Sequence, residues 1–168
     1  VEDIPLSGLG KREAEKAGLF FKQIGGVQAI YSSPLARTRD TAEIIAGHLG
    51  LKVRTLPEVK EIDLSGILEF FKGGASKLPV KIGPKDLPFP LFRTVMRTTA
   101  SFFFFIWLFG NLPDNEKPGE VAARLEEAFR QLDAAPEERI LVASHGYFIS
   151  FLGQHLMRKD PGDILLMR

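Results

Sequence analysis

Cysteine is absent from the 168 residues of this chain. Its absence excludes disulfide bonds and metal sites with thiolate ligands, and it is typical of a reducing, cytoplasmic compartment. Histidine is scarce as well, and the three residues His48, His145 and His155 are too scattered in the sequence to form a metal-binding motif. We therefore expect no bound metal and no other cofactor.

An excess of charge of either sign is also missing. The 22 lysine and arginine residues nearly balance the 21 aspartate and glutamate residues, and the formal net charge is +1. This balance gives no electrostatic reason to expect a nucleic-acid partner or binding to an anionic membrane surface. Any anion site must therefore arise from the local placement of a few cationic side chains.

No apolar run is long enough to cross a membrane. The most apolar stretch, residues 102–109, is far shorter than the roughly 20 residues that a membrane-spanning helix needs. It is interpreted as a buried strand or core helix, with an apolar surface that faces a substrate or partner as the alternative. Residues 1–10 lack the basic start and apolar run of a secretory signal.

Residues 1–168 are expected to form one domain, because 45% of them are hydrophobic and their number suits a single core. Helical spacing of apolar residues predicts helices over 11–24, 35–48 and 147–157, and another that begins after Gly119 and ends before Pro136. In the first helix the apolar residues Ala14, Ala17, Phe21 and Ile24 lie on one face. Strands are predicted over 27–31, 51–55 and 140–143, the last covered on both faces. This alternation predicts a three-layer α/β/α fold with a largely parallel sheet.

Two loops carry the candidate functional residues. Residues 32–37 and 144–146 each follow a predicted strand and precede a predicted helix, which is where parallel α/β proteins bind anions. Arg37 offers a planar fork of donors to phosphate oxygens, and His145 can hydrogen-bond an oxyanion while it changes charge near neutral pH. Each residue alone also fits an ordinary role, an arginine on the solvated surface and a histidine that caps a helix.

In combination these motifs resemble the histidine phosphatase superfamily, whose members are phosphoglycerate mutase-like. The resemblance covers residues 1–65 and about 118–157. Its most specific element is the Ser-Pro-Leu-x-Arg motif that ends at Arg37 and is followed by Thr41; the Ser-His-Gly motif around His145 is informative because it occurs in the same order. The remaining matches are residues 3–7, residues 41–45 and the helix that carries Glu120, Val121 and Arg124.

The resemblance implies a phosphohistidine mechanism, which mainly requires positioning and positive charge around the phosphoryl oxygens. It assigns phosphate binding to Arg37, to His145 and to N–H groups near Gly146. A glutamate in the loop after the third family strand should protonate the leaving oxygen. Glu61 fits best and Glu58 is the runner-up, and such a carboxyl group needs a raised pKa. The alternative for either glutamate is an exposed loop charge.

The sequence departs from the family pattern at three places. It contains no Arg-His-Gly motif, which in the family ends the first strand and carries the nucleophilic histidine; His48 and His155 are predicted to lie in helices and are not substitutes. Ser65 replaces the usual glycine. Residues 67–115 are not recognised as part of the family pattern and are interpreted as a variable insertion or lid. We expect an amino-terminal extension of the natural protein to supply the first strand; the alternative is that residues 102–108 pair there.

The favoured hypothesis is a phosphatase that acts on a small phosphorylated metabolite. A mutase of the phosphoglycerate type is less favoured, because the middle segment does not resemble that of mutases. The alternatives from other classes are a non-catalytic relative that retains the phosphate pocket and an interaction protein that uses the phenylalanine-rich segment. The sequence leaves a homodimer open.

Overall fold

In the computed structural model, the described residues are 3–66, 107 and 115–159. The chain divides into two compact units, Val1–Ile62 with Ala122–Arg168, and Asp63–Val121. The expectation of one domain over residues 1–168 stays a prediction. The pairing suggested for residues 102–108 and nearly all of the predicted insertion lie outside the described residues.

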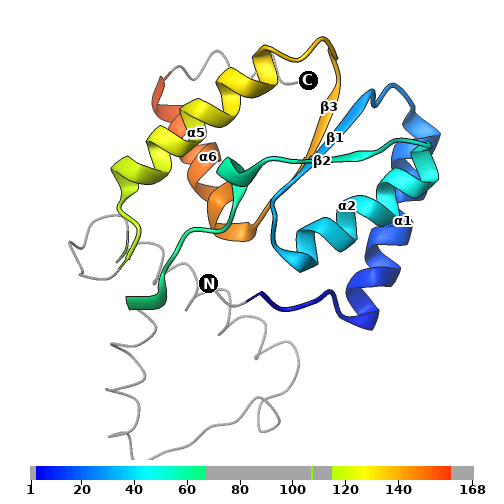
Figure 1. The fold of residues 1–168 in the computed structure, drawn as a ribbon, viewed down its shortest axis with the longest axis horizontal. Helices are drawn as coiled ribbons and strands as arrows, with labels where there is room; N and C mark the ends of the chain where they lie inside the picture. The colour runs from blue at the N-terminus through cyan, green and yellow to red at the C-terminus, as the bar shows by residue number, and fades with distance from the viewer. Residues whose placement is uncertain (1–2, 67–106, 108–114, 160–168) are drawn as a thin grey trace, which may run out of the picture. The chain divides into compact units, whose positions relative to one another are not determined.

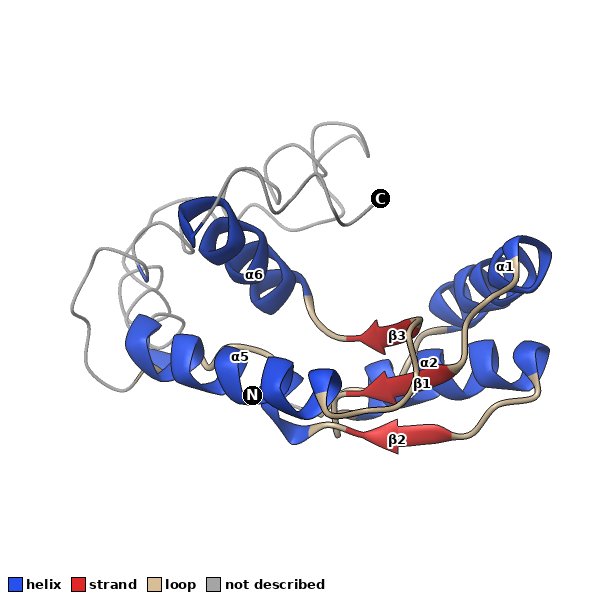
Figure 2. Cartoon of the chain, turned by 90° about the horizontal axis from the view of Figure 1, so that it is seen from above, coloured by secondary structure: helices blue, strands red, loops and turns tan. Residues whose placement is uncertain are grey.

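A parallel sheet forms the centre of the first unit. Its strands are β1 (Ala29–Ser32), β2 (Val53–Thr55) and β3 (Ile140–Ala143), in the order β2-β1-β3. Ile30 of β1 lies opposite Val53 on one side and Leu141 on the other. All three arrows point the same way in Figure 2. The prediction of a parallel α/β fold is confirmed, and the carboxyl ends of β1 and β3 meet at one edge of the sheet.

Helices α1 (Gly8–Ile24) and α2 (Ala36–Leu49) lie on one side of this sheet (Figure 1). The α1 helix begins earlier than predicted, because the Ser7 hydroxyl accepts a hydrogen bond from the Gly10 N–H at 3.1 Å and caps the helix. The α2 helix packs against α1 and all three strands. The buried core contains Ile30, Ala42, Ile45 and Ala46.

The predicted apolar face of α1 is buried over only part of its length. Ala14 and Gly18 are buried, whereas Ile24 is 57% exposed. The close approach between α1 and α2 occurs at Gly18, where an added Cβ atom would lie only 2.4 Å from His48. Ile24 is the last residue of the helix, more than a turn beyond that approach. The helical period alone therefore does not show how far along α1 the apolar face is buried.

The remaining elements are the short 3-10 helix η1 (Pro57–Val59), α5 (Pro118–Asp133) and α6 (Gly146–Lys159). The predicted apolar face of α5 is confirmed, because Val121, Leu125 and Ala128 are buried. In the part of the chain that the structure describes, no helix combines the length and the apolar character needed to span a membrane.

The strand β3 has the predicted bounds but not the predicted burial. All four of its residues are partly exposed rather than covered on both faces. Among the described residues β3 pairs only with β1, so it lies at the edge of the sheet that they form. Burial of a strand depends on its neighbours in space, and an apolar run in the sequence does not reveal them.

Candidate active site

The two loops predicted to bind an anion lie side by side. Because β1 and β3 are paired, the residues that follow them are brought together, and the Ser33 N–H donates to the Ala143 carbonyl at 3.0 Å. The imidazole Nε2 atom of His145 lies 2.8 Å from the Ser33 hydroxyl oxygen. Both residues are buried, with exposures of 4% for His145 and 1% for Ser33. A direct hydrogen bond thus joins residues that are 112 positions apart in the sequence.

Arg37 belongs to the same site. It lies in the first turn of α2, which begins at Ala36, and its side chain is partly buried. Its positive charge contributes to lowering the pKa of His145 and opposes the raised pKa of Glu61, so the guanidinium acts electrostatically on both groups. The Ala36 N–H donates to an Asp3 carboxylate oxygen at 2.6 Å, which caps the start of this helix.

Glu61 follows η1 and reaches the start of α6. Its Oε1 atom accepts hydrogen bonds from the N–H groups of Ile62 at 3.1 Å and Phe148 at 3.2 Å. Burial raises the pKa of Glu61, although the two N–H groups and the positive charge of Arg37 oppose this shift. The direction of the shift is the one that a general acid requires.

The other glutamate, Glu58, has a different environment. Its Oε2 atom is buried and has no hydrogen-bond partner among the described residues. Glu58 takes part in the local structure through its backbone carbonyl, which accepts a hydrogen bond from Arg124. Of the two candidates, Glu61 is therefore the one that contacts the helix following His145.

The charge state of His145 differs from the expectation. Burial, reinforced by the positive charges of Arg37 and Arg124, lowers the pKa of His145 to about 4, although Asp3 opposes the shift. The prediction that His145 changes charge near neutral pH is wrong, because with this pKa the imidazole is neutral at pH 7. A bound phosphate dianion would favour the imidazolium form and raise the pKa again.

This shift predicts a pH dependence of stability. Unfolded His145 binds a proton below about pH 6.5, whereas folded His145 stays neutral down to about pH 4. Between these values the unfolded state binds more protons, so the contribution of His145 to the free energy of unfolding falls as the pH is lowered from 6.5 to 4. Urea denaturation of the protein and of His145→Gln across this range should show a shallower decline in the variant. Identical declines in both would rule out His145 as the titrating group.

Sequence reasoning gave no mechanistic role to Arg124. Its Nη1 atom donates hydrogen bonds to the carbonyl oxygens of Glu58 and Lys60, the latter at 3.0 Å. The guanidinium also lies over the Phe148 ring, 5.1 Å from its centroid. Arg124 thus links the segment before Glu61 to α6. The available signal was an arginine on the apolar face of a helix, three residues after Val121.

Ser144 makes a second link to the same segment. Its hydroxyl donates to the Val59 carbonyl at 2.8 Å, so the loop after β3 is tied to η1. The two remaining histidines lie elsewhere: His48 contacts Glu15 at 2.5 Å and His155 contacts Glu126 at 3.0 Å. Within residues 3–66, 107 and 115–159, no three histidine or acidic side chains cluster as metal ligands would.

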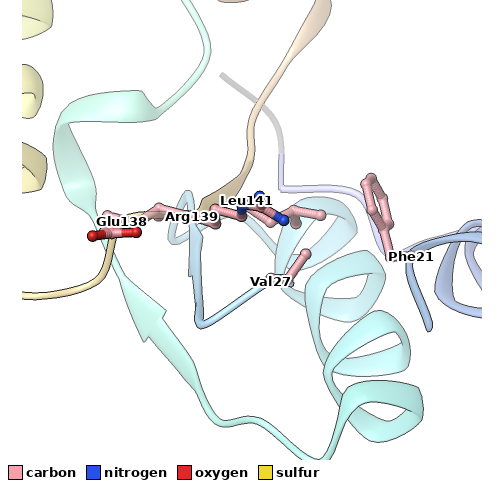
Figure 3. Close-up of a pocket in the computed structure, with 6 residues that line it drawn as sticks. Phe21, Val27, Glu138, Arg139 and Leu141 are labelled. Atoms are coloured by element: carbon pink, nitrogen blue, oxygen red, sulfur yellow. The ribbon is translucent and has the colours of Figure 1, made fainter. Parts of the chain in front are cut away.

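A hollow of about 550 Å³ lies at the other end of the sheet. Figure 3 shows Phe21 and Val27 on one side of it and Arg139 and Leu141 on the other. These residues precede or begin β1 and β3, whereas the candidate site follows the carboxyl ends of those strands. Arg37, Glu61 and His145 do not line the hollow, so it is not the candidate active site.

The fold and the site define a class of protein. The family model described as the histidine phosphatase superfamily (branch 1) matches residues 1–69 and 102–168. The chain therefore belongs to the histidine phosphatase superfamily, whose members transfer phosphoryl groups. The family resemblance predicted from the sequence is confirmed, and the match extends over residues 67–69 and 102–115, which were not expected to resemble the family.

Particular relatives differ in name. The chain is 27% identical over 160 residues to an uncharacterized phosphatase, PhoE, of Bacillus subtilis, covering 95% of this chain and 68% of the relative. It is 31% identical over 151 residues to a probable phosphoglycerate mutase, GpmB, of Proteus mirabilis, covering 89% of this chain and 62% of the relative. The chain thus spans roughly two thirds of the length of these curated relatives.

Solved structures agree on the fold. A mycobacterial glucosyl-3-phosphoglycerate phosphatase matches with a TM-score of 0.60 and 22% sequence identity, covering 93% of this chain and 70% of that chain. A Bacillus stearothermophilus protein, YhfR, matches with a TM-score of 0.61 and 20% identity, covering 91% and 67%. At such identities the likeness establishes the fold alone.

Proposed function

We propose that the protein is a phosphatase that hydrolyses a small phosphorylated metabolite through a phosphohistidine intermediate. The observation that carries this proposal is the convergence of Arg37, Glu61 and His145 beside the carboxyl ends of β1 and β3. The hydrogen bond of His145 to Ser33 and the charge of Arg37 acting on the other two groups support it. The phosphatase name of the Bacillus subtilis relative favours the same reaction.

Each residue has a role in the proposed reaction. A histidine attacks phosphorus, the bond from phosphorus to the ester oxygen breaks, and Glu61 gives its proton to that oxygen. Arg37 binds the equatorial oxygens in both steps, and His145 donates a hydrogen bond to them. Water then attacks phosphorus, the phosphorus–nitrogen bond breaks, and Glu61 accepts the proton of the water. The proposal assigns the attacking histidine to an Arg-His-Gly motif, which these 168 residues do not contain.

A second candidate is phosphoryl transfer within one metabolite. The Proteus mirabilis relative, at 31% identity, is named a probable phosphoglycerate mutase. In a mutase the phosphohistidine passes its phosphoryl group to another hydroxyl of the substrate instead of water. The two reactions share all the roles above and differ in the acceptor, which depends on how well the site excludes water.

Activity on a substrate panel tests the proposal. The protein expressed from its complete gene should release inorganic phosphate from p-nitrophenyl phosphate, sugar phosphates or phosphoglycerates, with and without a chelator of divalent metals. Inorganic phosphate and vanadate should inhibit competitively, because both resemble the transferred group. Conversion of one phosphoglycerate isomer to another without phosphate release would favour the mutase. Binding of both anions without either reaction would favour a non-catalytic relative.

Three expectations from the sequence accompany the proposal. They are a cytoplasmic location, no nucleic-acid partner and a homodimer as the open alternative to a monomer. Cell fractionation, a nucleic-acid binding assay and light scattering test them in turn.

A further inference from the structure

The position of Ser33 is held by hydrogen bonds on several sides. Its N–H donates to the Ala143 carbonyl at 3.0 Å, which continues the pairing of β1 with β3. Its own carbonyl accepts a hydrogen bond from the hydroxyl group of Ser32 at 2.9 Å. The pairing with β3 holds the backbone of Ser33 and places its side chain next to His145.

The Ser33 hydroxyl makes two contacts of its own. Its oxygen accepts a hydrogen bond from the Leu35 N–H at 3.3 Å and lies 2.8 Å from Nε2 of His145. A serine hydroxyl carries one proton, and a buried hydroxyl group needs an acceptor for that proton. Among the described residues, Nε2 of His145 is the acceptor that the Ser33 hydroxyl reaches. The Ser33 proton therefore points at Nε2, and Nε2 accepts it with a free lone pair.

This assignment determines where the imidazole carries its own proton. A neutral imidazole has one N–H group and one acceptor nitrogen, so an accepting Nε2 requires the proton to be on Nδ1. His145 is neutral at pH 7, because its pKa is lowered to about 4. Within the described part of the chain, no hydrogen bond engages Nδ1 of His145, which leaves this N–H group for a ligand.

We propose that Ser33 is a positioning residue that holds His145 in the tautomer protonated on Nδ1, so that an N–H donor faces the phosphoryl group of the substrate. The part of this inference that concerns the substrate rests on the proposed function, whereas the tautomer does not. With the opposite tautomer, Nε2–H would donate to Ser33 and Nδ1 would turn a lone pair toward phosphate oxygens, which repel it. While the imidazole is neutral, the Ser33 hydroxyl group thus decides whether His145 first meets the anion with an N–H donor or with a lone pair.

The neighbouring serine supplies a matched control. Ser32 and Ser33 are both 1% exposed, and both lose one hydroxyl group when replaced by alanine. The Ser32 hydroxyl donates its proton to the Ser33 carbonyl, and among the described residues the hydrogen-bond partner of the His145 ring is Ser33. Ser32→Ala should therefore reproduce the structural cost of removing a buried hydroxyl group without removing the partner of Nε2. Ser33→Thr keeps the hydroxyl group and should retain the tautomer.

The decisive measurement is the ¹⁵N NMR spectrum of the imidazole nitrogens of His145 at pH 7, in the protein expressed from its complete gene. We expect a protonated Nδ1 and an unprotonated Nε2 in the unsubstituted protein, in Ser32→Ala and in Ser33→Thr, and a mixture of tautomers in Ser33→Ala. Removal of a side chain that orients a functional histidine typically costs on the order of 10-fold to 100-fold in activity, and we expect such a loss in kcat/KM for Ser33→Ala.

The outcomes separate this inference from the proposed function. A proton on Nε2 in the unsubstituted protein, or an unchanged tautomer in Ser33→Ala, would overturn the role of Ser33 whatever the activity. An equal loss of kcat/KM in Ser32→Ala and Ser33→Ala would also overturn it, since a general packing effect would then suffice. Absence of turnover in the unsubstituted protein would count against the phosphatase proposal, while the NMR spectrum would still decide the tautomer.

Discussion

Replacing Arg37 by alanine should lower kcat for a phosphomonoester by about 10²- to 10³-fold, the usual effect of removing one donor to a developing oxyanion. The planar fork of an arginine can bind two phosphoryl oxygens at once, and those oxygens gain charge as the reaction proceeds. Affinity for inorganic phosphate and vanadate should fall in the same variant. Steady-state kinetics and an inhibitor titration measure both effects.

Two further variants make this prediction specific. Arg39→Ala removes the same charge from an exposed position on the same helix and should leave kcat and phosphate affinity close to those of the unsubstituted protein. Arg37→Lys keeps the charge but loses the fork, so it should recover only part of the activity. Equal losses of kcat in Arg37→Ala and Arg39→Ala would show that the total positive charge of the protein, and not a direct contact of Arg37 with phosphate, supports the reaction. Unchanged kinetics in Arg37→Ala would remove this residue from the site.

A loss of similar or greater size is expected for Glu61→Gln, and it should depend on the leaving group. A positioned general acid contributes about 10²- to 10⁴-fold, so the variant should lose that factor with an alkyl phosphate such as a sugar phosphate. With p-nitrophenyl phosphate the loss should be much smaller, since p-nitrophenolate departs without a proton. Rates measured for both substrates, with the unsubstituted protein and the variant, give the comparison directly.

Glu58→Gln is the matched control for the acid. It removes the same carboxylate charge three residues away, from a side chain whose buried Oε2 has no hydrogen-bond partner among the described residues. This variant should leave the ratio of the rates for the two substrates unchanged. Because burial raises the pKa of Glu61, activity on the alkyl phosphate should decline as the pH rises through that pKa, and Glu61→Gln should lack this limb. If the loss of activity depended on the leaving group in Glu58→Gln and not in Glu61→Gln, Glu58 and not Glu61 would be the general acid.

The elements around the site could be predicted from the sequence because their signals are local. Helix α2 ends at Leu49 and is capped by Gly50, which adopts a left-handed conformation with φ of 67°, and the predicted helix ended one residue earlier, at His48. The bounds of β3 were predicted correctly as well. Its partial exposure was not, because exposure depends on which strands lie beside it in space.

The site residues also divide into those with a local sequence signal and those whose role depends on contacts between distant segments. Arg37 and His145 could be selected because both follow strands, and the carboxyl ends of parallel strands meet at one edge. The hydrogen bond from Ser33 to His145 and those from Arg124 to the segment before Glu61 span 112 and more than 60 residues, and no local pattern encodes them. The lowered pKa of His145 was missed for a related reason, since it follows from burial and from charges on other elements.

The pairing of β3 beside β1 also bears on how the protein is made. During synthesis on the ribosome, β1 and α2 emerge long before β3. The middle strand β1 therefore cannot pair with β3 until that later segment has been synthesised. Closing so long a loop is entropically costly and slows folding. Until β3 has emerged from the ribosome, His145 and Arg37 cannot act on the same anion, so a nascent polypeptide that ends before β3 cannot bind phosphate through both loops.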